Sequence, residues 1–142
     1  MISVREFLCQ GRGLKLEIDE LQEAHQKAFD LACSMSRKSE EEIATSVEMK
    51  YANYAQYSAM IEKRIKDLSI HRKKMLEIIN KIPSTTHRTL LIARYINCES
   101  WEEVAESIGY ESVKWVRTTL HDKAIASAEK NKNTTLNYPI DM

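Results

Sequence analysis

The chain has 142 residues, of which 43% are hydrophobic and 30% are charged, and it contains only 3 Gly and 2 Pro. This composition favours long helices over sheets or disorder. Lys and Arg total 21 and Asp and Glu also total 21, so no overall basic charge draws the protein to nucleic acid.

Two long helices are predicted in the first half of the chain. In residues 3–35 the heptad positions are Val4, Phe7, Gly11, Leu14, Ile18, Leu21, His25, Ala28, Ala32 and Met35. After a polar break at residues 34–42, a second set comprises Val47, Tyr51, Tyr54, Ser58, Ile61, Ile65, Leu68, Arg72, Met75, Ile79 and Ile82. Pro83 ends the second helix, because proline disfavours a helical residue before it. Neither helix has a core of its own, so we expect residues 1–82 to pair as an antiparallel coiled-coil hairpin, with another chain, or both.

Residues 83–127 are predicted to form a small helix-turn-helix domain. After a first helical run, Ser100 and Glu103 form a capping box that starts the second helix. Gly109 supplies the positive φ that ends this helix without a steric cost. The small side chain of Ala105 would let the second and third helices approach closely.

The third helix starts at Ser112, and its apolar residues recur at helical spacing on one face. These residues are Val113, Val116, Leu120 and Ala124. At about 100° per residue, the opposite face carries donors and flat rings suited to phosphates and base edges. We therefore expect DNA contacts from Ser112, Lys114, Trp115, Arg117, Thr118, Thr119 and His121. An alternative role for Trp115 is packing on the preceding helix or on a partner subunit.

The predicted DNA-binding domain is not basic. Residues 83–127 hold five Lys and Arg against six Asp and Glu, a net charge of −1. With few phosphate contacts, one copy would bind DNA weakly. We expect a homo-oligomer, with a dimer favoured, formed through the N-terminal helices, or RNA polymerase as a partner, to compensate. Residues 128–142 are polar and are expected to form a mostly disordered tail.

Several segments together resemble a known family. They are Arg94-Tyr95-Ile96, Ser100-Trp101-Glu102-Glu103-Val104-Ala105, Gly109-Tyr110, Trp115-Val116 and Leu120-His121. The combination resembles the ArpU/RinA-type late-gene transcription regulators of phages and prophages, and residues 116–124 resemble the C-terminal DNA-binding region of sigma factors. The resemblance implies activation of phage late genes together with host RNA polymerase. Glu111 departs from the pattern as an extra residue in the turn, which would shift the residues that face DNA.

The sequence shows no pattern for catalysis, a cofactor or a metal. The segment Gly11-Arg12-Gly13 lies too deep in a helical pattern for a phosphate loop, and a local kink or a close helix contact explains it better. The 3 Cys are widely separated and lack metal or redox spacing, which fits a reducing cytoplasm. No apolar run is long enough to span a membrane. We expect a cytoplasmic protein that is not an enzyme and binds no cofactor.

The leading functional hypothesis is a sequence-specific transcription regulator that binds double-stranded DNA. One alternative is a small-terminase-like DNA-recognition subunit of a phage packaging machine, which also joins a helix-turn-helix to oligomerising helices. A second alternative is a helical adaptor that binds only protein. Oligomer size discriminates between the first two, since a monomer or dimer favours the regulator and a ring of many subunits favours packaging.

Overall fold

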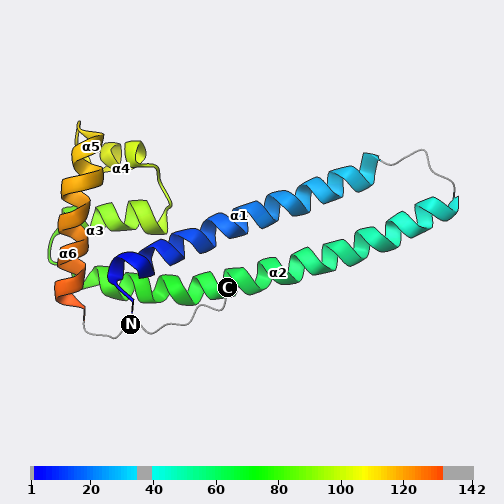
Figure 1. Cartoon of the computed structure of the whole chain (residues 1–142), viewed down its shortest axis with the longest axis horizontal. Coiled ribbons are helices and arrows are strands. Elements are labelled where there is room, and N and C mark those ends of the chain that lie inside the picture. The colour runs from blue at the N-terminus through cyan, green and yellow to red at the C-terminus, as the bar shows by residue number, and fades with distance from the viewer. Residues whose placement is uncertain (1, 35–39, 133–142) are drawn as a thin grey trace. The chain divides into compact units, whose positions relative to one another are not determined.

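The computed structural model describes residues 2–34 and 40–132, and the side chains of residues 2–30, 52 and 54–132. The elements, labelled in Figure 1 where there is room, are α1 (Val4–Ser34), α2 (Glu40–Asn80), α3 (Thr85–Leu91), η1 (Ile92–Ile96), α4 (Trp101–Ile108), α5 (Val113–Trp115), η2 (Val116–Leu120) and α6 (His121–Asn131), where η denotes a π-helical turn. The described ranges contain helices and no strand, which confirms the all-α prediction. Within them, no helix is long and apolar enough to cross a membrane. Most of the predicted break, residues 35–39, and the end of the predicted tail lie outside the described residues.

The chain divides into two units, and the division differs from the predicted boundary at Pro83. The first, here called the core unit, comprises Met1–Lys15 and Leu68–Met142, and the second, the helix-pair unit, comprises Leu16–Asp67. The boundary moves because the first turns of α1 and the last turns of α2 bury their apolar stripes in the same cluster as the C-terminal helices. Residues 1–82 are therefore not a separate domain.

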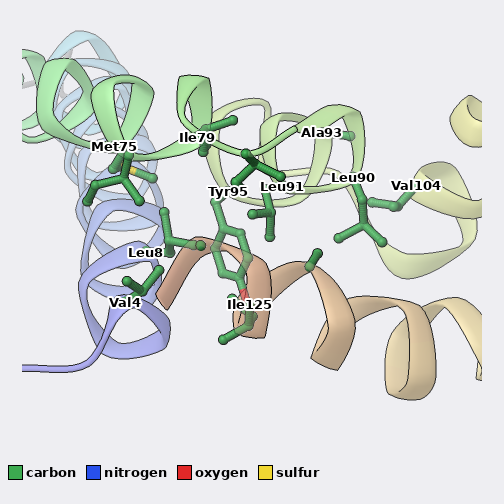
Figure 2. Packing of buried hydrophobic residues seen from close by; sticks show 14 of the residues in the cluster. Val4, Leu8, Met75, Ile79, Leu90, Leu91, Ala93, Tyr95, Val104 and Ile125 are labelled. Carbon is green, nitrogen blue, oxygen red and sulfur yellow. The ribbon is translucent and has the colours of Figure 1, made fainter. Parts of the chain in front are cut away.

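Burial of apolar side chains from every helix of the core unit holds it together. Figure 2 shows Val4 and Leu8 from α1 and Ile79 from α2 gathered with residues of the C-terminal helices. Helix α6 packs against α3, and Tyr95 extends from η1 toward α6. Burying a large aliphatic side chain contributes roughly 1.5–3 kcal/mol, so this shared cluster is the main source of stability. The C-terminal helices depend on the ends of α1 and α2 for their core.

Helix α2 turns a different edge toward α1 from the one predicted. The sequence pattern assigned Ser58, Ile65 and Arg72 to the seam, but Ser58 is exposed and Ile65 is 47% exposed. The seam instead uses Tyr57, Arg64, His71 and Ile78, each one residue earlier, together with the shared positions Tyr54, Ile61, Leu68, Met75 and Ile82. The error arises because both edges contain the shared positions and both carry polar residues, Ser58 and Arg72 on the predicted edge and Arg64 and His71 on the observed one.

The polar residues of this seam have specific partners. Arg64 Nε donates to Glu17 Oε1 at 2.9 Å within the helix-pair unit. In the core unit His71 is fully buried, its ring stacks on Phe7 at 4.0 Å, and its Nε2 lies 2.6 Å from the Phe7 carbonyl oxygen. Buried polar groups are tolerated when they are hydrogen-bonded, so these pairs allow a charged and an aromatic side chain between two helices.

Gly11 lies at a close contact between α1 and α2, one of the two alternatives predicted for this segment. A Cβ atom at this position would overlap the side chain of Met75 and lie 2.8 Å from His71 Cδ2. At Gly13 no atom lies within 4 Å of the corresponding Cβ position, so of these two glycines only Gly11 lies against α2. The missing side chain of Gly11 leaves room for the side chains of Met75 and His71 on α2.

Candidate nucleic-acid interface

Helix α4 begins and ends as the sequence predicted. Ser100 Oγ accepts from the Glu103 backbone N–H at 3.2 Å, and Glu103 Oε1 accepts from the Ser100 N–H at 3.3 Å. At the other end Gly109 has φ of 79°, and the N–H of Tyr110 donates to the Ala105 carbonyl at 2.9 Å. Ala105 is 2% exposed, so its methyl lies inside the core as expected. These contacts fix the length and direction of α4.

Residues 109–112 connect α4 to a continuous helix that runs from α5 through η2 to the end of α6. Ser112 caps the start of this helix, since its Oγ accepts from the Trp115 N–H at 3.2 Å. Val116, Leu120 and Ala124 are buried, which confirms the predicted inner face. The helix continues beyond the predicted end of the domain.

The predicted tail does not begin at residue 128. Helix α6 extends to Asn131, Ala128 is fully buried, and Glu129 Oε1 accepts from the Val4 backbone N–H at 2.6 Å. The last turn is therefore held by the N-terminus of α1. The sequence pattern missed this contact because the two segments lie 125 residues apart.

Five of the seven predicted contact residues share an exposed surface on α5 and η2. They are Ser112, Lys114, Arg117, Thr118 and Thr119. We call these five residues, together with Trp115, the outer face. Thr118 Oγ1 donates to the Lys114 carbonyl at 2.7 Å, which leaves its lone pairs and methyl directed away from the backbone bond. The outer face thus presents an ammonium, a guanidinium and three hydroxyl groups within two helical turns.

Trp115 is half-buried, so it packs against the core and also reaches the outer face. Its ring lies 5.2 Å from the ring of Tyr110 with an angle of 33° between the planes. Tyr110 is 39% exposed and was not among the predicted contact residues. An exposed aromatic residue directly after the glycine that ends α4 is the signal that could have identified it. The pair places two aromatic surfaces at the edge of the outer face.

His121 is not on the outer face, which corrects its assignment as a DNA contact. It is 4% exposed, and its Nε2 lies 2.6 Å from the Tyr95 hydroxyl oxygen. The N–H of His121 bonds to the carbonyl of Val116, five residues earlier. His121 precedes Ala124 and Ile125 by three and four residues, so it lies on the same side of the helix as these two buried residues. The prediction defined the inner face by Val116 and Leu120 and therefore assigned His121 to the flank of the opposite face.

The Tyr95–His121 pair is electrically neutral. Burial, together with the positive charge of Arg5, lowers the pKa of His121 to about 4. Burial likewise raises the pKa of Tyr95 to about 12. The rings of Trp101 and His121 form a T-shaped pair with centroids 4.9 Å apart. These three residues join η1, α4 and α6 behind the outer face, and their role is to hold the helices in place.

The beginning of α4 is tied to η1 by an arginine. The guanidinium of Arg94 lies 4.3 Å from the centroid of the Trp101 ring and donates to the Glu99 carbonyl at 3.0 Å. Arg72 of α2 donates to the Ile96 carbonyl at 2.7 Å, so it bonds to η1 and does not extend toward solvent. The side chains of Arg94, Tyr95 and Trp101 therefore serve the packing of η1, α4 and α6.

The core unit has a different net charge from residues 83–127 alone. The core unit contains 14 Lys and Arg against 10 Asp and Glu, a net charge of +4, whereas the helix-pair unit has 7 against 11, a net charge of −4. The N-terminal turns of α1, the end of α2 and the end of α6 with the residue after it supply the added cations. Within the core unit, five acidic residues are concentrated in and around α4: Glu99, Glu102, Glu103, Glu106 and Glu111. The remainder of the unit is correspondingly basic.

The described residues contain no group of three or more His, Cys, Asp or Glu arranged to hold a metal ion. No family model, curated protein or solved structure matches the chain.

Proposed function

We propose that the protein is a sequence-specific DNA-binding transcription regulator that reads the major groove with the outer face of α5 and η2. The observation that carries the proposal is the outer face itself, where Lys114, Arg117 and three hydroxyl side chains project from a helix whose opposite side is buried. An α-helix fits the major groove, where base edges present distinct patterns of donors and acceptors. In this proposal α4 and the helix beginning with α5 act as a helix-turn-helix.

The chemistry of the outer face suits both parts of DNA recognition. Arg117 can donate two parallel hydrogen bonds to guanine or to a phosphate, and Lys114 provides a point charge for phosphate. The threonine methyls and the Trp115 ring can contact thymine methyls, which carry sequence information. The +4 charge of the core unit supports binding, because cations that neutralise phosphates release counterions from the duplex.

The family resemblance extends the proposal to a biological setting. On that resemblance we propose late genes of a phage or prophage as the targets, double-stranded DNA as the ligand and host RNA polymerase as the protein partner. The acidic exposed side of α4 would face away from the phosphates, since like charges repel.

Selection from a library of random-sequence duplexes tests the proposal, followed by anisotropy titrations of the selected site at several salt concentrations. We expect a selected sequence to bind at least about 1,000-fold more tightly than a scrambled duplex. Arg117→Ala should reduce specific affinity by about 10-fold or more, and Lys114→Ala should lower the slope of log K against log salt by about one. Lys63→Ala, an exposed lysine of the helix-pair unit, is the matched control and should change neither quantity. Failure to enrich any sequence would contradict the proposal.

A further inference from the structure

The helix that carries the outer face has a row of exposed side chains at a spacing of four residues. The exposed row comprises Lys114, Thr118, Asp122, Ala126 and Lys130, whereas the buried row comprises Val116, Leu120, Ala124 and Ala128. Residues four apart lie on the same side of a helix, so the exposed row runs along the outward side from α5 to the end of α6. Asp122 follows Thr118 on this row by about 6 Å along the helix axis.

The carboxylate on the exposed row has a partner from the beginning of the chain. Arg5 Nη2 donates to Asp122 Oδ1 at 2.8 Å, and the two side chains are 50% and 66% exposed. Arg5 belongs to the first turns of α1, and both residues lie in the core unit. The other acidic residue of α5, η2 and α6 is Glu129, which accepts from the Val4 backbone N–H at 2.6 Å. The start of α1 thus binds both acidic residues of this helix.

Without its partner, Asp122 would oppose the binding of DNA by the outer face. The major groove is about as wide as a helix with its side chains, so phosphates line both sides of a helix that enters it. With Lys114 and Thr118 in the groove, Asp122 lies one turn farther along the same row. Charges are only partly screened over about 8 Å at physiological salt, so a free carboxylate there would repel the phosphates. Paired with Arg5, this position carries no net charge.

We propose that Arg5 is a positioning residue of the nucleic-acid interface, which masks Asp122 so that duplex phosphates can approach the outer face. The inference rests on the proposed DNA binding and adds to it a residue from α1. It predicts opposite effects for the two partners. Loss of Arg5 leaves the carboxylate unpaired and weakens binding, whereas loss of the Asp122 charge frees the guanidinium for a phosphate and tightens binding. A pair that only held α1 against α6 would give effects of the same sign.

Anisotropy titrations of the full chain with the selected duplex and with a scrambled duplex, at about 0.15 M salt, test the masking. Arg5→Ala should weaken binding by about 3-fold or more, Asp122→Asn should tighten it by about 3-fold, and the double variant should return to within about 2-fold of the wild type. Both duplexes should respond by similar factors, because phosphates are common to every sequence.

An exposed ion pair in the helix-pair unit supplies the matched controls. Lys27 Nζ lies 3.0 Å from Glu23 Oε1, with side chains 75% and 55% exposed. Lys27→Ala and Glu23→Gln make the same changes in net charge as the two test variants, and each should change binding by less than about 2-fold. Effects as large as those of Arg5→Ala and Asp122→Asn would overturn the inference, because net charge alone would then explain them.

The remaining outcomes separate this inference from the proposed function. Weaker or unchanged binding by Asp122→Asn, or a double variant as weak as Arg5→Ala, would overturn the masking and leave sequence-specific binding by the wild type standing. A wild type that binds no duplex would overturn both. Circular dichroism should show the same helix content in all variants, since exposed ion pairs contribute little to stability. If Arg5→Ala loses helix content, Asp122→Asn still decides, because it retains Arg5.

Discussion

Acid is expected to destabilise the core unit through the buried imidazole of His121. The folded protein holds this group neutral, with its pKa lowered to about 4, whereas in the unfolded chain it takes up a proton near its ordinary pKa of 6.5. Stability is therefore complete above pH 6.5 and is lost as pH falls from 6.5 toward 4. With each pKa unit worth 1.36 kcal/mol, this group should remove about 2.5 kcal/mol from the free energy of unfolding between pH 7.5 and 4.5.

Urea denaturation followed by circular dichroism at pH 7.5, 6.5, 5.5 and 4.5 measures this loss in the wild type and in His121→Gln. Glutamine does not titrate, yet its amide can still pair with the Tyr95 hydroxyl. The variant should be less stable than the wild type by about 1–2 kcal/mol at pH 7.5 and equal to it or more stable at pH 4.5. His71, whose pKa is also lowered by burial, adds an acid loss common to both proteins. A difference between the two proteins that stays constant from pH 7.5 to 4.5 would refute the reasoning.

Three further predictions concern packing. Ala105→Glu buries an unpaired carboxylate and should cost at least about 3 kcal/mol in chemical denaturation, whereas the exposed neighbour Glu106→Ala should cost less than about 0.5 kcal/mol; similar costs would mean that Ala105 is not in the core. Gly11→Leu should destabilise the protein by about 2–3 kcal/mol because it overlaps Met75, and Gly13→Leu should be neutral or slightly stabilising; a stable Gly11→Leu protein would contradict the close contact. A fragment of residues 83–142 should be largely unfolded, because it lacks the α1 and α2 residues of its core. Circular dichroism and the dispersion of amide proton signals measure this. A cooperative thermal transition in the fragment would show that those residues are dispensable.

Local signals in the sequence determined where α4 begins and ends and where α5 begins. The capping box at Ser100, the left-handed Gly109 and the cap at Ser112 each act through hydrogen bonds or backbone angles within a few residues. Such features depend only on neighbouring residues, so they can be read without the fold. The apolar spacing of Val116, Leu120 and Ala124 likewise identified the inner face of the third helix.

Only the tertiary structure decided which surfaces meet. His121 lies in the core, where the Tyr95 hydroxyl supplies its partner from 26 residues away. The edge of α2 that faces α1 includes Arg64 and His71, whose polarity is tolerated only because Glu17 and the Phe7 carbonyl lie opposite. Heptad spacing cannot distinguish the two edges of α2, since both contain the shared positions. The division into two units was also beyond the sequence pattern. The first turns of α1 and the last turns of α2 are buried by helices that are distant in the sequence.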